Sequence, residues 1–231
     1  MIRAEKLSKA YQGVPAVSEV DLTVPEGELC VLLGPSGCGK STLLRLINAL
    51  TPADSGTVTV RGQDISRMPP EQLRRGIGYV VPNVGLFPHY TVRRNIAVVP
   101  ELLKWKKPDI IKRTAFLMEL TGLPQKYLDK YPHELSGGEA QRVGVARALA
   151  ADPPILLMDE PFGSVDPLNR ERLQRSFLDI QRTLKKTVLF VTHDVSEALI
   201  MGDRILLMRE GRIARSGTPR EMVFGEGDAF R

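Results

Sequence analysis

The chain has 231 residues, of which 42% are hydrophobic and 26% are charged, and its formal net charge is +5. This composition is typical of a folded globular protein, and no apolar run approaches the roughly 18 residues that cross a bilayer. Basic residues are interleaved with acidic ones, which disfavours nucleic acid as a partner. Because the N-terminus has no apolar signal core, we expect a cytoplasmic protein. Cys30 and Cys38 lack metal-site spacing and are expected to be free thiols.

Three apolar runs each end at residues that can carry chemistry. "LCVLLG" begins at residue 29 and enters a glycine-rich turn, "ILLMDE" begins at residue 155 and ends in two carboxylates, and "VLFVTH" begins at residue 188 and ends in a histidine. Continuous apolar runs of this length favour parallel strands buried on both faces, and helical patterns lie between them. We therefore predict an α/β fold whose ligands gather at the carboxyl ends of the strands.

The first turn, "GPSGCGKST", matches the phosphate-binding pattern G-x-x-x-x-G-K-[ST] and follows a predicted strand. Its glycines allow backbone N–H groups to converge on phosphate oxygens, and the helix that follows turns its positive dipole end toward the anion. Lys40 is expected to bind the β- and γ-phosphates, and the Ser41 hydroxyl is expected to bind Mg²⁺. The predicted nucleotide-binding residues of this loop are Gly34, Pro35, Ser36, Gly37, Cys38, Gly39, Lys40, Ser41 and Thr42.

The middle of the chain has a helical pattern. Residues 108–122, "PDIIKRTAFLMELTG", have a proline at the expected helix start, a glycine at the stop and apolar residues at helical spacing. "SGGEAQRVGVARALAADPP" predicts a second helix closed by prolines. We predict one domain over residues 1–231, in which a helical subdomain (83–152) is inserted into a catalytic core formed by residues 1–82 and 153–231.

"LSGGEAQR", residues 135–142, places two adjacent glycines before a predicted helix. As helix residues they would be unfavourable, since each glycine inside a helix costs about 1 kcal/mol. Bare backbone at this point suits the close approach of a phosphate. Ser136 and Glu139 also fit an S-x-x-E capping box. The two interpretations are compatible, because a capped helix start is still an anion site.

Asp159 and Glu160 end the second apolar run. Asp159 can hold Mg²⁺ directly or through water, and Glu160 can polarise a water for attack on a γ-phosphate. Alone, such a pair is more often a solvated strand end, and the phosphate loop favours the functional interpretation. Near the C-terminal end of the sequence, Thr218 and Glu221 predict a second capping box at the start of a last helix.

The phosphate loop, "LSGGE", "ILLMDE", "SVD" (164–166) and "VTHD" (191–194) resemble, in order and approximate spacing, the motifs of the ATP-binding subunits of ABC transporters. The resemblance covers almost the whole chain. It implies a P-loop NTPase core with a mixed, largely parallel sheet, an antiparallel β portion near the N-terminus and an inserted helical subdomain. Within that family, "NVGLFPHYTVRRNIAVVPELLKW" is most similar to importers of glycine betaine, carnitine, choline and related osmoprotectants.

The resemblance assigns roles to further residues. Tyr11 would stack on adenine, with a half-buried strand tyrosine as the alternative interpretation, and His193 would orient the water that attacks the γ-phosphate. ATP and Mg²⁺ are the cofactors that the resemblance implies. The implied catalytic groups are Glu160, His193 and Lys40, and the implied metal ligands are Ser41 and Asp159.

The same resemblance implies a dimer. Ser136 and Gly138, with Gly137 between them, would contact ATP held by a second copy of the chain, and Asp166 would signal between the two sites. Transmembrane permease subunits would hold the protein on the inner face of the cell membrane, and an extracytoplasmic solute-binding protein would take part indirectly. We expect Phe87 and Pro88 to contact the permease, with packing inside the helical subdomain as the alternative.

Pro82 departs from the family pattern, which normally has a glutamine whose amide binds Mg²⁺ or its water. Proline makes neither contact. Asn83 carries an amide, but neighbouring side chains of an extended segment point to opposite faces. We predict slow hydrolysis, since losing one supporting ligand typically costs about 10–100-fold. The alternative is that Pro82 simply ends a strand.

The expected function is therefore that of an ATP-binding and ATP-hydrolysing subunit of an osmoprotectant importer. Two alternatives stay open. One is an ABC-type ATPase without transport, which would act in DNA repair, on ribosomes or in cell division. The other is a nucleotide-binding subunit in which Pro82 impairs hydrolysis.

Overall fold

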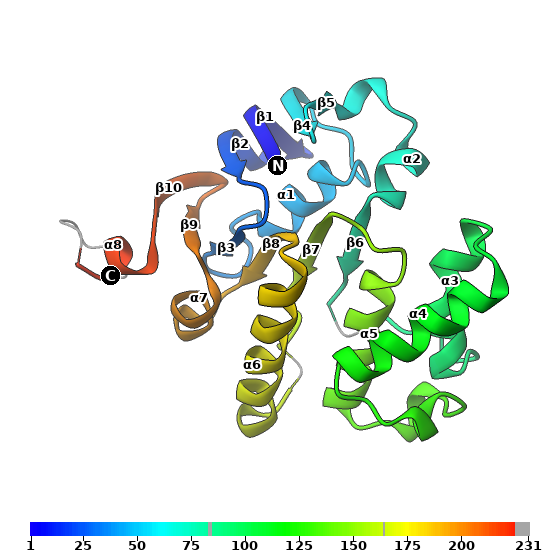
Figure 1. Ribbon diagram of the computed structural model, residues 1–231. Coiled ribbons are helices and arrows are strands. Elements are labelled where there is room, and N and C mark those ends of the chain that lie inside the picture. Colours follow the sequence, from blue (N-terminus) through cyan, green and yellow to red (C-terminus); the bar gives the residue numbers. More distant parts are fainter. Residues whose placement is uncertain (83–84, 164, 225–231) are drawn as a thin grey trace. The chain divides into compact units, whose positions relative to one another are not determined.

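The computed structural model describes residues 1–82, 85–163 and 165–224. Asn83 and Ser164, which the sequence analysis named, lie outside these ranges. The chain divides into two compact units: Met1–Arg74 together with the chain from Lys186 onward, and Arg75–Lys185. Figure 1 labels the elements of both. No helix within the described ranges combines the length and the apolarity that a membrane crossing needs.

An antiparallel sheet forms the N-terminal part of the first unit. Its strand order is β2-β1-β4-β5, with bounds of Ile2–Tyr11 for β1, Val14–Val24 for β2, Ser55–Val60 for β4 and Gln63–Asp64 for β5. The central strand β1 places Ile2 opposite both Val24 and Val60. Alternate residues of β1 are buried at its start, as expected for a sheet with one face on the core. The expected antiparallel portion is confirmed.

A second set of strands in this unit has the order β10-β9-β3-β8. β3 (Leu29–Leu33) pairs in parallel with β8 (Thr187–Thr192) and β9 (Arg204–Arg209), while β10 (Arg212–Gly217) runs antiparallel to β9. Every residue of β3 and β8 is buried, which is why both read as continuous apolar runs. The helices of this unit are α1 (Lys40–Ile47), α7 (Val195–Met201) and α8 (Pro219–Phe224), and α2 (Pro70–Arg75) ends at the unit boundary.

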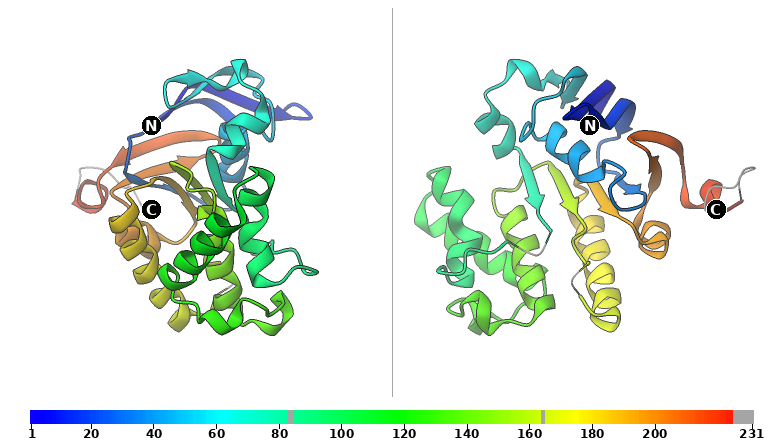
Figure 2. Two further views of the ribbon diagram at one scale, coloured as in Figure 1. Left: turned by 45° about the vertical axis from the view of Figure 1, so that its right-hand side comes forward. Right: turned by 180° about the vertical axis from the view of Figure 1, so that it is seen from behind.

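The second unit contains a parallel pair of strands and most of the helical residues. β6 (Ile77–Val80) pairs with β7 (Ile155–Asp159). The helices are α3 (Val92–Leu102), α4 (Lys107–Leu120), α5 (Gly137–Leu149) and α6 (Pro167–Leu184). α3, α4 and α5 pack on one another, and both views of Figure 2 show them grouped in green. Short 3₁₀ turns cover Ile65–Arg67 in the first unit and Gln125–Tyr127 and Pro132–Glu134 in the second.

Local sequence signals fix several helix ends. The helix predicted over 108–122 is observed as α4, with a proline in its first turn and Gly122 at φ +64° after its end. The predicted box at α8 is also confirmed: the Thr218 N–H donates to Glu221 at 2.7 Å, and the Glu221 N–H donates to the Thr218 hydroxyl at 3.3 Å. The division of the chain at residues 82 and 153 into core and inserted subdomain stays a proposal.

Candidate nucleotide-binding site

The glycine-rich loop joins β3 to α1 in the first unit and encloses the Lys40 side chain. Lys40 is 5% exposed, and its Nζ donates hydrogen bonds to the carbonyl oxygens of Gly34 and Pro35, both at 2.8 Å. A buried ammonium needs such partners, because an unpaired buried charge is costly. The loop therefore forms a closed turn around the Lys40 ammonium.

Two of the loop glycines are required by sterics within the chain. Gly39 caps α1 at φ +107°, and a Cβ added there would lie 2.1 Å from the Ala16 carbonyl oxygen. A Cβ on Gly34 would lie 2.3 Å from the Met208 carbonyl oxygen. Any side chain at either position would force neighbouring backbone to move. Neighbouring strands therefore press directly on the backbone of the loop.

Cys30 and Cys38 are free thiols, as predicted, and both are buried. Burial raises the pKa of the Cys30 thiol to about 12. Burial also raises the pKa of the Cys38 thiol, although the Lys40 ammonium opposes this effect. Both thiols are therefore protonated at neutral pH. The Cys38 backbone holds the loop in place, since its carbonyl accepts from the Gly211 N–H at 3.1 Å.

His193 emerges at the same sheet edge as the glycine-rich loop. Leu33, the last residue of β3, pairs in parallel with Thr192, the last residue of β8. The next residue of each strand, Gly34 on one and His193 on the other, therefore follows at the same edge. His193 is exposed. This register places the glycine-rich loop and the "VTHD" motif at one sheet edge of the first unit.

Tyr11 is the last residue of β1 and is 45% exposed. The Lys9 ammonium lies 5.7 Å from the centre of the Tyr11 ring. An exposed ring at the end of a strand is accessible for stacking.

The two carboxylates end β7 in the second unit. Asp159 is the last residue of the strand and is 1% exposed, while Glu160 follows at φ +45°. Pro82 follows β6 in the same unit and is exposed.

The capping box predicted in "LSGGEAQR" is confirmed at the start of α5. The Ser136 N–H donates to the Glu139 carboxylate at 2.8 Å, and the Glu139 N–H donates to the Ser136 hydroxyl at 3.3 Å. The Ser136 N–H holds the pKa of Glu139 below its usual value. A Cβ on Gly138 would meet only Leu173, at an ordinary 3.8 Å, among the described residues. Packing within the described chain therefore does not require glycine there.

Asp166 caps α6. Its carboxylate accepts from the Asn169 N–H at 3.1 Å and from the Asn169 side-chain amide at 2.8 Å. This contact explains the local role of an aspartate at this position without reference to a second copy of the chain.

Asn95, which the sequence analysis missed, holds the loop before α3. Asn95 is fully buried, and its Oδ1 accepts from the Phe87 N–H at 2.9 Å. The carbonyl oxygens of Phe87, Tyr90 and Thr91 each lie 3.1 Å from its Nδ2, whose two protons are shared among these three acceptors. The available signal was a single amide within the apolar stretch "NIAVV". Phe87 itself is 40% exposed.

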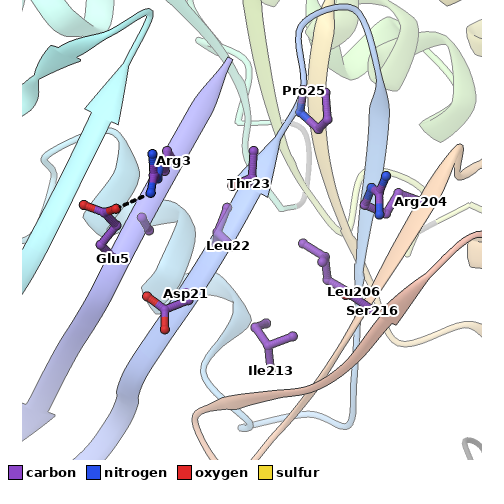
Figure 3. A pocket seen from close by; sticks show the side chains of 11 residues that line it. Arg3, Glu5, Asp21, Leu22, Thr23, Pro25, Arg204, Leu206, Ile213 and Ser216 are labelled. Atoms are coloured by element: carbon purple, nitrogen blue, oxygen red, sulfur yellow. Dashed lines mark ion pairs between the residues drawn. The ribbon is translucent and has the colours of Figure 1, made fainter.

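The first unit also has an open cavity of about 540 Å³ between β1, β2, β9 and β10. Figure 3 shows side chains of both signs around it, including the Arg3–Glu5 pair at 2.5 Å, Asp21 and Arg204. None of the predicted site residues lines this cavity. Within the described ranges, no three His, Cys, Asp or Glu side chains gather as a metal site.

A glycine-rich loop that joins a buried parallel strand to a helix and encloses a lysine defines a P-loop nucleotide-binding domain. More narrowly, the chain belongs to the ABC transporter family, whose sequence profile matches residues 17–163.

Curated relatives of the chain are named as ATP-binding proteins of import, transport and uptake. It is 51% identical to the osmoprotectant import ATP-binding protein OsmV of Salmonella typhimurium, with all of this chain and 62% of the relative aligned. It is 48% identical to the glycine betaine/carnitine/choline transport ATP-binding protein OpuCA of Bacillus subtilis, with all of this chain and 61% of the relative aligned. It is 47% identical to the glycine betaine uptake system ATP-binding protein YehX of Escherichia coli, with all of this chain and 75% of the relative aligned. The chain thus spans about three fifths of the length of the first two relatives.

Solved structures support the fold. The ATP-binding cassette MJ0796, a dimer bound to ADP and Pi in a post-hydrolysis state, superposes with a TM-score of 0.85 at 30% identity, covering 95% of this chain and 99% of that one. The protein cbiO1 of Clostridium perfringens, part of an ABC transporter complex, superposes with a TM-score of 0.89 at 30% identity. The superposition covers 97% of this chain and 90% of that one. The predicted fold class, an ABC ATPase fold, is confirmed.

Proposed function

We propose that this chain is the ATP-binding and ATP-hydrolysing subunit of an importer for osmoprotectants of the glycine betaine, carnitine and choline type. The observation that carries the proposal is the glycine-rich loop around Lys40, with His193 at the same sheet edge. The substrate class rests on the relatives, which are named for transport of these compounds. The names of these relatives favour transport over the non-transport ATPase alternative.

The proposed roles follow from side-chain chemistry. Lys40 and the loop N–H groups bind the phosphates of ATP, and Tyr11 stacks on adenine. Ser41 and Asp159 supply the hydroxyl and carboxylate oxygens that Mg²⁺ prefers, and the ion would neutralise phosphate charge when bound. Glu160 accepts a proton from the attacking water. His193 orients that water.

A second copy of the chain is proposed to complete each site. Ser136, Gly137 and Gly138 would approach the γ-phosphate held by the partner copy, and Asp166 would connect the two sites. The absence of a steric demand for glycine at position 138 among the described residues supports this arrangement, because a glycine that packing does not require leaves bare backbone for a ligand. We further propose that Phe87 and Pro88 contact a membrane permease, which would place the chain at the inner face of the membrane.

Phosphate release from ATP and Mg²⁺ by the purified chain tests the enzymatic part. We expect turnover by the wild type, and for Glu160→Gln we expect loss of turnover together with an ATP-dependent dimer in light scattering. Glu71→Gln removes an exposed glutamate and is the matched control, expected to behave as wild type. Wild-type phosphate release no faster than that of Glu160→Gln would refute the ATPase assignment.

The substrate class needs a separate test with the membrane partner. The chain is co-expressed with its permease and solute-binding protein and reconstituted in vesicles. ATP-driven accumulation of labelled glycine betaine, carnitine or choline is expected. Turnover without accumulation of any of these compounds would contradict the substrate class and leave the ATPase assignment intact.

A further inference from the structure

We propose that Thr192 and Glu197 are positioning residues that fix the turn carrying His193. The inference rests on the proposed function, because it assumes that His193 acts on the water that attacks ATP. It concerns two side chains to which the sequence analysis assigned no role and that do not belong to the predicted nucleotide site.

The Thr192 hydroxyl is the centre of the arrangement. Thr192 ends β8 and is 2% exposed. Its Oγ donates to the Glu197 Oε2 at 2.6 Å and accepts from the Asp194 N–H at 3.0 Å. A hydroxyl has one proton, so these two bonds fix its orientation: the proton goes to the carboxylate and a lone pair faces the N–H. The backbone on both sides of His193 is thereby tied to one atom.

Asp194 links this arrangement to the start of α7. Its Oδ1 accepts from the Ser196 N–H at 2.8 Å and from the Glu197 N–H at 3.3 Å, which caps α7. Thr192, Asp194 and Glu197 are therefore linked to one another by hydrogen bonds. His193 lies between the first two of these residues in the sequence. The His193 side chain is exposed, and the backbone that carries it is held by this turn.

Burial of Glu197 indicates that these hydrogen bonds do more than cap a helix. Glu197 is 5% exposed, and a buried carboxylate is costly unless it accepts strong hydrogen bonds. Asp194 already caps the short helix α7. The Glu197 carboxylate adds a charge-assisted bond to Thr192, the class of hydrogen bond that is short and strong. Because Thr192 pairs with Leu33, a fixed Thr192 also fixes His193 relative to the glycine-rich loop.

The test compares two threonines at opposite ends of β8. Thr192→Val keeps the shape and removes the donor and acceptor. Thr187→Val is the matched control: Thr187 is also 2% exposed, and its hydroxyl accepts from the Gly27 N–H at 3.1 Å, far along the strand from His193. Thr192→Ser restores the hydroxyl. All variants are made in the full chain, and thermal unfolding is recorded for each.

Two measurements separate positioning from stability. The first is kcat and KM for ATP. The second is the NMR spectrum of labelled histidine, which is simple because the chain has 3 histidines and His193→Gln assigns the signal of interest. The NMR measurement needs no catalysis. A wild type without turnover would therefore refute the proposed function and leave the positioning role testable.

For Thr192→Val we expect kcat to fall about tenfold or more with KM unchanged, since small misplacement of a reacting group costs this much. The His193 signal should shift or broaden. Thr187→Val should leave both unchanged even if it unfolds at a lower temperature, and Thr192→Ser should be near wild type. A wild-type His193 signal and kcat in Thr192→Val, or equal changes in Thr187→Val, would overturn the proposal.

A second variant covers the case in which Thr192→Val does not fold. Glu197→Gln keeps the side-chain volume and an acceptor oxygen but loses the charge that strengthens the bond to Thr192. The expected changes in kcat and in the His193 signal have the same direction and are smaller. No change in either measurement would overturn the proposal.

Discussion

The Lys40 ammonium donates a hydrogen bond to the Gly34 carbonyl oxygen at 2.8 Å, so the lysine at the start of α1 bonds the first residue of its own loop. The cation therefore holds the loop closed from inside. Bound phosphate oxygens can exchange with these carbonyls as partners of the ammonium. Hydrogen bonds within the chain thus order the loop, and ordering of this kind lowers the cost of binding a ligand.

Replacing Lys40 tests this arrangement. In Lys40→Met we expect ATP to bind about 10- to 150-fold more weakly, the equivalent of losing a charged hydrogen bond of about 1.5–3 kcal/mol. Titration calorimetry with ATP and Mg²⁺ measures the change. Lys126→Met, which removes an exposed lysine, is the control and should bind as wild type. Equal affinities in all three proteins would contradict the assignment of Lys40 to phosphate.

Two glycines of the loop should differ in their tolerance of alanine. Gly37 has φ +80° and no atom of the described residues within 4 Å of an added Cβ, so Gly37→Ala should lower the free energy of unfolding by about 1–2 kcal/mol from backbone strain alone. Gly39→Ala adds a contact of 2.1 Å with the Ala16 carbonyl oxygen and should lower it further. Urea unfolding of both variants measures the difference. An equal loss in the two would show that the clash is relieved.

The Glu139 carboxylate should make stability depend on pH. The Ser136 N–H lowers the folded-state pKa of Glu139 below the usual 4.5, so the carboxylate stabilises the folded state fully above that value. This contribution is lost as the pH falls through the lowered pKa. We expect the wild type to be more stable than Glu139→Gln at neutral pH and the gap to close in acid.

Urea unfolding at neutral pH and across the carboxyl titration range measures that gap. Ser136→Ala breaks the other half of the box and should cost about 1 kcal/mol. A gap between wild type and Glu139→Gln that stays constant into acid would mean that Glu139 is not the titrating group.

Pro82 is the position where restoring a side chain should increase activity. Pro82 is exposed, so glutamine can be accommodated. If the missing amide slows hydrolysis, Pro82→Gln should raise turnover by about 10-fold or more at saturating ATP and Mg²⁺. Pro52→Gln, at another exposed proline, controls for a general effect of losing a proline. An unchanged rate in Pro82→Gln eliminates the idea.

Features that depend on neighbours in sequence were predictable. The buried parallel strands read as apolar runs, α4 has proline and glycine at its two ends, and both capping boxes need only residues three positions apart. Pro100 lies inside α3 near its end, although a proline disfavours the interior of a helix.

Features that depend on the path of the chain in space were not predictable. The four hydrogen bonds of Asn95 reach back to residues four to eight positions away in a loop whose course no local rule gives. The bond between Thr192 and Glu197 needs a strand end and a helix face brought together by one turn. A lone polar residue in an apolar stretch signals that a partner exists but not which one.

The way Asn95 supports its loop has an evolutionary consequence. Main-chain groups of residues 87–91 are bonded to one amide. The rings of Phe87, His89 and Tyr90 meet one another edge-to-face or at a tilt, and Arg94 and Arg147 lie over the rings of Tyr90 and Phe87. Those rings can be exchanged for other side chains while the scaffold beneath them keeps its shape. Side chains of this loop can therefore change in evolution while the backbone beneath them keeps its course.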